Sequence, residues 1–281
     1  MLEHIVNLHG QDKMSRTSEL RSCLMIVSLF HVLVMCHIVT GAIGLVAFWL
    51  PITTQKGGSL HVRAGRVFTI CMLSTGFLAV GISTTTLLSP VATHPDPALN
   101  GDAALIRGIF GWMMQYLAVL TINLAWYGWL AAINKRDHYK NREWRNFLLQ
   151  ALVAVTALNC LVQGLLIDQI LMVGISFVGF ATVVTNLLFL TKEAPSPFDW
   201  LLEHIKALVG AGISVYTAFL AFGAVRLMPE AALSPVLWAI PLGTGISLII
   251  YHQQKVKRRY LPKQPKNRPK NRLVPQLFED R

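Results

Sequence analysis

The sequence predicts an all-α fold: a polytopic membrane helix bundle of about seven transmembrane helices. Of its 281 residues, 53% are hydrophobic and only 14% are charged, whereas ordinary soluble domains carry about a quarter charged residues. Several apolar runs exceed the roughly 18 residues needed to cross the hydrocarbon core of a bilayer. Because lipid offers no hydrogen-bond partners to the backbone, these runs must be helical.

The apolar runs divide into seven predicted spans. The first is longer than the apolar region of a signal peptide and no small-residue cleavage site follows it, so we expect a retained helix. The fourth and fifth flank the short stretch Ile167 to Gln169, and together they cover about 45 residues, enough for two crossings. The predicted spans are 22–50, 64–88, 104–133, 145–166, 169–191, 205–227 and 235–252.

The basic residues of the connections predict the orientation, because cytoplasmic loops retain Lys and Arg. The connections after the third, fifth and seventh spans are basic, whereas those after the second, fourth and sixth carry acidic residues. This alternation places the protein in the cell inner membrane with its N-terminus outside and its C-terminus in the cytoplasm. The basic residues concerned are Lys135, Arg136, Lys140, Arg142, Arg145, Lys192 and Lys206, and the acidic ones are Asp96, Asp102, Asp168 and Glu230.

We expect three regions: an N-terminal extramembrane segment (1–21), a seven-helix transmembrane domain (22–252) and a basic, disordered cytoplasmic tail (253–281). From Lys255 to Arg281 there are ten Lys or Arg residues against Glu279 and Asp280, interleaved with prolines that disfavour a helix. Such a tail is suited to lie on anionic lipids of the bilayer. No nucleic-acid partner is expected, because no stacking pattern of aromatic residues accompanies the charge.

His37 is a candidate cofactor-binding residue in the first span. Together with Gly41 and Gly44 it follows an i, i+4, i+7 pattern, so the three share one helix face. Glycines allow close approach of a neighbouring helix, so His37 is expected to face protein rather than lipid. An ionisable residue in a membrane is a functional hypothesis by default; the alternative is a neutral imidazole bonded to a facing hydroxyl or carbonyl.

His61 and His204 are further candidate cofactor-binding residues, at matching levels near the cytoplasmic edge. They can meet if the second and sixth spans are neighbours, and Asp199 or Glu203 could then orient an imidazole. Haem or a metal ion is thus a candidate cofactor, although no metal site is assigned. A di-haem arrangement is disfavoured, because only the first span carries histidine at mid-depth. Both histidines could equally be ordinary interfacial residues.

Polar residues of the middle spans form a predicted inward-facing seam, which could line a small-ligand cavity. It could equally serve as hydrogen-bonding glue between helices, at about 0.6 kcal/mol per bond. The absence of mid-membrane carboxylates argues against a proton pump built on Asp or Glu. The candidate cavity residues are Gln115, Asn123, Asn159, Gln163 and Asn186.

Four short motifs carry a resemblance to a known family. They are H-x3-G in the first span, Lys-Gly followed by H-x3-G from His61 to Gly65, E-H with YTAF from Tyr216 to Phe219, and W-x2-P from Trp238 to Pro241. Taken together, the chain resembles the bacterial membrane family catalogued as domain of unknown function 2306, over residues of about 30 to 255. The resemblance implies a multi-pass membrane protein and supplies no established activity.

The sequence therefore favours an integral membrane protein that binds a small ligand or cofactor within its helix bundle for sensing or transport. One alternative is a haem- or metal-binding redox protein that uses His61 and His204. The other is a structural or assembly protein without a ligand. No enzymatic activity is assigned, since metalloprotease motifs such as HExxH are missing and no histidine accompanies the Ser83 to Thr86 hydroxyl cluster.

Overall fold

The computed structural model describes residues 2–95, 101–223 and 235–260, with side chains for residues 21–95, 101–221 and 236–260. Within these ranges the chain is helical and contains no strand. The elements are α1 Leu2–Thr53, α2 Ser59–Leu88, α3 Pro90–Thr93, α4 Ala103–Ile106, the π-helix η2 Arg107–Met113, α5 Met114–Asn134, the 3₁₀-helix η3 His138–Arg142, α6 Trp144–Leu166, α7 Ile170–Leu190, α8 Asp199–Ala218, the π-helix η4 Phe219–Gly223 and α9 Pro235–Tyr260.

Seven helical stretches of the described chain are long and apolar enough to cross a membrane, which confirms the predicted all-α polytopic bundle. Two helices begin earlier than the sequence predicts: α2 begins at Ser59 and not at residue 64, and α8 begins at Asp199 and not at residue 205. At the C-terminal side α9 continues to Tyr260, so the first part of the predicted tail is helical. Residues 224–227 of the predicted sixth span and 261–281 of the predicted tail lie outside the described residues.

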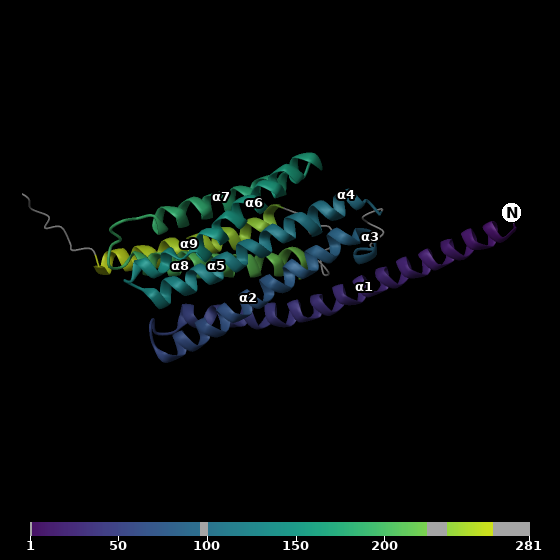
Figure 1. Ribbon diagram of the computed structural model, residues 1–281. Helices are drawn as coiled ribbons and strands as arrows, with labels where there is room; N and C mark the ends of the chain where they lie inside the picture. The colour runs from purple at the N-terminus through teal and green to yellow at the C-terminus, as the bar shows by residue number, and fades with distance from the viewer. Residues whose placement is uncertain (1, 96–100, 224–234, 261–281) are drawn as a thin grey trace, which may run out of the picture.

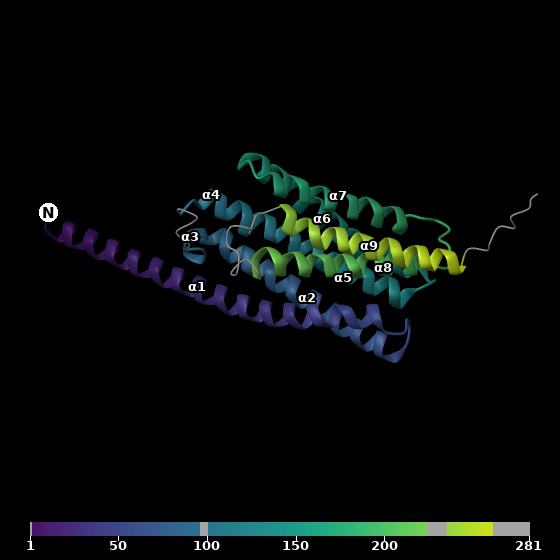
Figure 2. The same ribbon diagram turned by 180° about the vertical axis from the view of Figure 1, so that it is seen from behind.

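The central element is α5, preceded directly by η2. It contacts α2, α6 and α8, and each of these pairs with a further helix: α1 on α2, α7 on α6, and α9 on α8 (Figures 1 and 2). The central helix is more buried than the outer ones. In the 18-residue apolar window of Ala103–Asn134, 67% is buried inside the protein, compared with 6% in that of Arg21–Thr53. The bundle is thus three helical pairs around one central helix.

Glycines set the close approaches to α5. A Cβ added at Gly128 would lie 2.9 Å from the Cβ of Ala207 in α8. A Cβ added at Gly76 of α2 would lie 2.5 Å from the side chain of Ile122 and 3.3 Å from the carbonyl oxygen of Ala118. Small residues let helix backbones approach in this way, so α2 and α8 pack tightly on either side of α5.

One end of the bundle, which we call the basic end, gathers most of the charged connections. It comprises the α1–α2 turn, the α5–α6 connection (135–143), the α7–α8 connection (191–198) and the C-terminal end of α9, which lie together opposite the N-terminus (Figure 1). This is the end that the sequence predicts to be cytoplasmic. The α2–α3 and α6–α7 turns lie at the opposite end.

Candidate functional site

His37 faces α2, as its pattern with glycine predicts. Its Nδ1 lies 3.1 Å from the carbonyl oxygen of Thr75, and the Thr75 hydroxyl donates to Thr40 at 2.8 Å. Gly44, on the same face, lies against Met72 of α2. The imidazole is thus directed at protein. Its contact with the Thr75 carbonyl matches the alternative to cofactor binding, in which the imidazole bonds to a facing hydroxyl or carbonyl.

His61 lies in the first turn of α2, next to the end of α1. Its Nδ1 is 3.0 Å from the carbonyl oxygen of Pro51, which also accepts from the Lys56 ammonium at 2.7 Å. The last carbonyls of a helix have no partner within the helix, and donors at this end satisfy them. His61 and Lys56 together therefore cap the C-terminus of α1.

His204 lies in α8 and faces the central helix. Its Nδ1 is 3.0 Å from the carbonyl oxygen of Gly128 in α5. The imidazole lies within electrostatic range of that of His61, and no hydrogen bond or ring contact between the two is found among the described residues. Each ring is oriented through Nδ1 by a backbone carbonyl, an arrangement in which Nε2 is the nitrogen left to bind a ligand.

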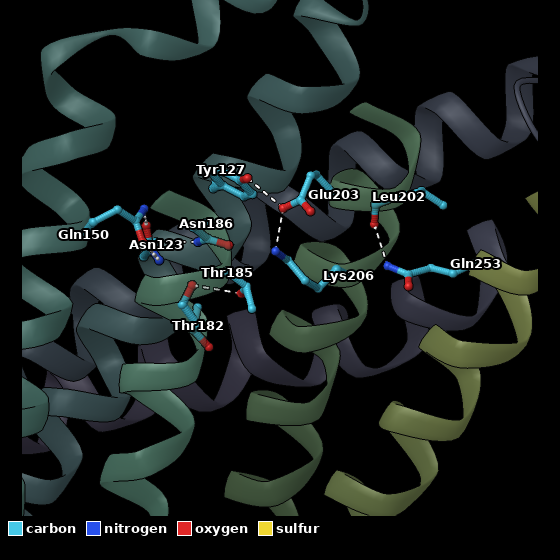
Figure 3. Close-up of polar contacts among 10 residues, drawn as sticks. All are labelled: Asn123, Tyr127, Gln150, Thr182, Thr185, Asn186, Leu202, Glu203, Lys206 and Gln253. Carbon is cyan, nitrogen blue, oxygen red and sulfur yellow. Dashed lines mark hydrogen bonds and ion pairs between the residues drawn. The ribbon is translucent and has the colours of Figure 1, made fainter. Parts of the chain in front are cut away.

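Basic groups surround this histidine pair at the basic end. Lys56 interacts electrostatically with His61 and Lys255, and burial together with Lys255 lowers the pKa of the Lys56 ammonium. His252 of α9 interacts with the same two lysines. Gln253 donates to the carbonyl oxygen of Leu202 and links α9 to α8 (Figure 3). A cationic environment of this kind disfavours a bound metal cation.

The two acidic residues near His204 do not orient an imidazole, contrary to the sequence-based expectation. Asp199 accepts from the Lys192 ammonium and from the backbone N–H of Ser196. Glu203 accepts from the phenol of Tyr127 at 2.7 Å and pairs with Lys206 at 2.5 Å (Figure 3). The imidazole partner of His204 is instead the carbonyl oxygen of Gly128, because Tyr127 and Lys206 occupy the Glu203 carboxylate and Lys192 occupies that of Asp199.

Two of the predicted cavity residues are brought together by a third amide. Gln150 of α6 donates to the Oδ1 of Asn123 at 2.7 Å, and its Oε1 accepts from Asn186 at 3.2 Å. All three side chains are buried, and they connect α5, α6 and α7 (Figure 3). The triad is a packed hydrogen-bonded contact, as the glue alternative predicts.

The other predicted cavity residues stay apart from this triad. Gln115 has a buried Oε1 with no partner among the described residues. Asn159 and Gln163 are half-buried on α6, and no hydrogen bond from either side chain is found in the described part of the chain. The predicted seam is therefore not one continuous line of contacts.

Two cavities open at the basic end. The α7–α8 cavity, of about 270 Å³, is lined by Thr185, Leu188, Phe189, Lys192, Asp199, Leu202 and Glu203. The loop cavity, of about 190 Å³, is lined by Lys135, Arg136, His138, Phe189, Pro195, Ser196, Pro197 and Trp200. Asn186 directly follows the lining residue Thr185 on α7, but neither cavity is lined by His37, His61, His204 or the predicted cavity amides.

The described ranges give little support for a metal site or for a catalytic nucleophile. No group of three or more His, Cys, Asp or Glu side chains there could hold a metal ion. The hydroxyls of Ser83, Thr85 and Thr86 bond to backbone carbonyls of their own helix. Each of these hydroxyls is therefore engaged within α2.

Comparisons with known proteins add no assignment: no family model, curated protein or solved structure matches the chain.

Sequence reasoning missed Gln150, Tyr127 and Lys206. A signal for Gln150 exists, because it lies with Asn146 on the same buried stripe of α6 as Val153, Ala157 and Cys160. A polar residue on an otherwise small and apolar stripe needs a partner. Tyr127 gives no such signal, since its role depends on α8 lying beside α5.

Proposed function

We propose that this integral membrane protein binds a small polar ligand in the α7–α8 cavity, for transport or sensing across the bilayer. The observation that carries the proposal is a cavity of about 270 Å³ whose wall includes Glu203, a carboxylate bonded to Tyr127 of the central helix. Ionisable residues in transmembrane helices mark ligand and ion pathways. Ligand occupancy at Glu203 would therefore act directly on α5, which contacts most of the bundle.

The lining favours a ligand with a positive charge or several hydrogen-bond donors. Its ionisable groups are Asp199, Glu203 and Lys192, two carboxylates against one ammonium. An ammonium group of a ligand can compete with Lys192 and Lys206 for these oxygens. Small amines and amino acids have this chemistry, and their size suits the cavity.

The packing of α7 would allow the α7–α8 cavity to open towards a ligand. This helix packs mainly on α6 and makes few contacts with α8, although both line the cavity. A helix held on one side can move relative to its other neighbour at low cost in buried surface. We therefore infer that the ligand enters between α7 and α8.

A thermal-unfolding screen of the purified full-length protein tests the proposal. Small primary amines, polyamines and amino acids are each added in turn, and a bound ligand raises the unfolding midpoint. Leu188→Trp, which puts a larger side chain into the cavity lining, and Glu203→Gln are expected to abolish the stabilisation. Glu193→Gln removes the same charge from an exposed position outside the cavity and is expected to retain it. The proposal fails if no compound stabilises the wild type, or if Leu188→Trp responds like the wild type.

A haem- or metal-dependent redox function is the second candidate, and the His61–His204 pair favours it. Both imidazoles are held through Nδ1 by a backbone carbonyl and lie within electrostatic range of each other, and imidazoles can serve as axial ligands of haem. Against it, neither cavity touches the pair. The absorbance spectrum of the detergent-purified protein decides between these functions. A Soret band that is present in the wild type and lost in both His61→Ala and His204→Ala supports haem binding. A colourless wild-type sample excludes the haem function. A purely structural role predicts neither a spectrum nor a ligand response.

We further propose the cell inner membrane as the location and the family catalogued as domain of unknown function 2306 as the relationship. The alternation of basic and acidic connections supports the first, and the motifs around His37, His61, Tyr216 and Trp238 support the second. The motif around Tyr216 has a structural role: the Tyr216 phenol accepts from Trp49 and donates to the Leu45 carbonyl, which fastens α8 to α1.

A further inference from the structure

We propose that the loop cavity binds a phosphate group, presented by an anionic lipid headgroup or by a soluble phosphate compound. This site is independent of the proposed amine site, although Phe189 borders both cavities. The cavity lies at the basic end between the α5–α6 and α7–α8 connections. It is the charge and the unpaired donors of its lining that indicate the ligand.

The ionisable residues of the lining are all basic. Lys135, Arg136 and His138 line the cavity, and no Asp or Glu does so. Within the described residues neither Lys135 nor Arg136 forms an ion pair. Two carboxylates close to the lining in sequence are engaged elsewhere, since Asp137 pairs with Lys140 and Asp199 pairs with Lys192.

The backbone holds this basic segment in an unusual conformation. Lys135 has φ +50° and ψ −113° directly after the last turn of α5, a region that residues other than glycine rarely adopt. The next residues turn tightly, with the backbone N–H of Asp137 bonded to Asn134 and that of His138 bonded to Arg136. Strained backbone of this kind is often retained at ligand sites.

His138 supplies the unpaired donor. Its ring packs edge-on against Phe189, with centroids 4.7 Å apart, and both ring nitrogens are buried without a partner among the described residues. Buried polar groups in folded proteins are normally hydrogen-bonded. An oxygen-rich anion in the cavity would accept from this imidazole as well as from the two flexible cations.

The geometry suits phosphate more closely than other anions. An Arg guanidinium binds phosphate oxygens with two parallel hydrogen bonds, and Lys adds a mobile positive charge. The opening lies at the edge of the transmembrane bundle on the side predicted to be cytoplasmic, where anionic headgroups and soluble phosphate compounds both occur. Trp200, whose Nε1 donates to the Pro197 carbonyl, also lines the cavity.

Titration of the purified full-length protein in an uncharged detergent tests the site. Inorganic phosphate is one probe and short-chain phosphatidylglycerol is the other, with short-chain phosphatidylcholine as the lipid of zero net charge. Binding is followed by calorimetry and by the thermal unfolding midpoint. Saturable binding of inorganic phosphate identifies a soluble ligand, and saturable binding of phosphatidylglycerol alone identifies a lipid; both outcomes support the site.

Matched variants separate a built site from diffuse surface charge. Arg136→Gln is expected to weaken binding of the effective probe about tenfold, and His138→Phe, which keeps the ring contact with Phe189, is expected to weaken it as well. Arg142→Gln removes an equal charge from an exposed position of the same connection outside the cavity, and should cost less than about twofold. Absence of saturable binding to both probes, or equal losses in Arg136→Gln and Arg142→Gln, overturns the proposal.

Discussion

At the scale of single residues, the backbone satisfies most of the polar side chains within the bundle. His37, His61 and His204 each direct Nδ1 at a carbonyl oxygen of a neighbouring helix or helix end. The sequence indicates that these residues need partners, because a lone polar group in a membrane is costly. It does not indicate which partners, since the carbonyls belong to segments far away in the chain.

Gln150 is the residue whose loss we expect to be most costly among the amides. Gln150→Leu leaves Asn123 and Asn186 buried without their shared partner, and each unsatisfied group costs about 1–3 kcal/mol. We expect a lower unfolding midpoint in detergent. Asn159→Leu, on the same helix but without a hydrogen bond in the described residues, serves as the control and should change stability little. Equal effects of the two substitutions would contradict the role given to the triad.

The burial of His94 leads us to expect that the stability of the folded protein depends on pH. It stacks on Phe110 with centroids 4.3 Å apart and contacts Phe30, and burial lowers its pKa from 6.5 to about 4. The unfolded chain therefore binds a proton that the folded chain does not, so this residue's contribution is complete above about pH 6.5 and is lost as pH falls towards 4.

The variant His94→Phe keeps the aromatic contact and removes the titration. Its unfolding midpoint should fall less between pH 7.5 and 5 than that of the wild type. Parallel thermal melts of both proteins across this range measure the difference. If the two midpoints fall in parallel, His94 is not a source of the pH dependence.

At the scale of helices, close packing depends on where glycine meets a neighbour. In α5, Gly128 lies against Ala207, and its carbonyl accepts from His204. In α7, Gly174 is exposed, with nothing within 4 Å of an added Cβ. Both glycines look alike in the sequence, because each lies in an apolar run; only the arrangement of α5 against α8 distinguishes them.

We therefore expect opposite results from the same substitution at these two glycines. Gly128→Ala forces α5 and α8 apart, because the new methyl group meets another Cβ at 2.9 Å, and should destabilise by about 1–3 kcal/mol. Gly174→Ala should be neutral or stabilise by up to about 1 kcal/mol through higher helix propensity. Equilibrium unfolding of the two variants in mixed detergent compares them, and a Gly128→Ala protein as stable as the wild type would exclude tight α5–α8 packing.

At the scale of the whole molecule, an odd number of crossings places the two termini on opposite sides. Seven helices satisfy the length and composition for spanning, and the basic connections all lie at one end of the bundle. Because cytoplasmic loops retain Lys and Arg, we propose that this end faces the cytoplasm. The basic residues on the two sides of the first helix are about equal in number, so this helix by itself favours neither orientation.

Reporter fusions test this orientation directly. A C-terminal fluorescent protein should fold and fluoresce in the cytoplasm, whereas alkaline phosphatase at the C-terminus should be inactive. At the N-terminus the accessibility of an epitope tag in intact spheroplasts should be high. Finding both termini on the same side would contradict the seven-span topology.

The sequence by itself determined the class, the number of spans and the helix face presented by His37. These are local properties, since crossing a bilayer requires a run of sufficient length with all its backbone hydrogen bonds internal, and helical periodicity fixes which residues share a face. Only the tertiary structure decided that Gln150 joins Asn123 to Asn186, that Tyr127 holds Glu203, and that the cavities lie at the basic end. Such contacts depend on the rotation and register of separate helices, which no single helix encodes.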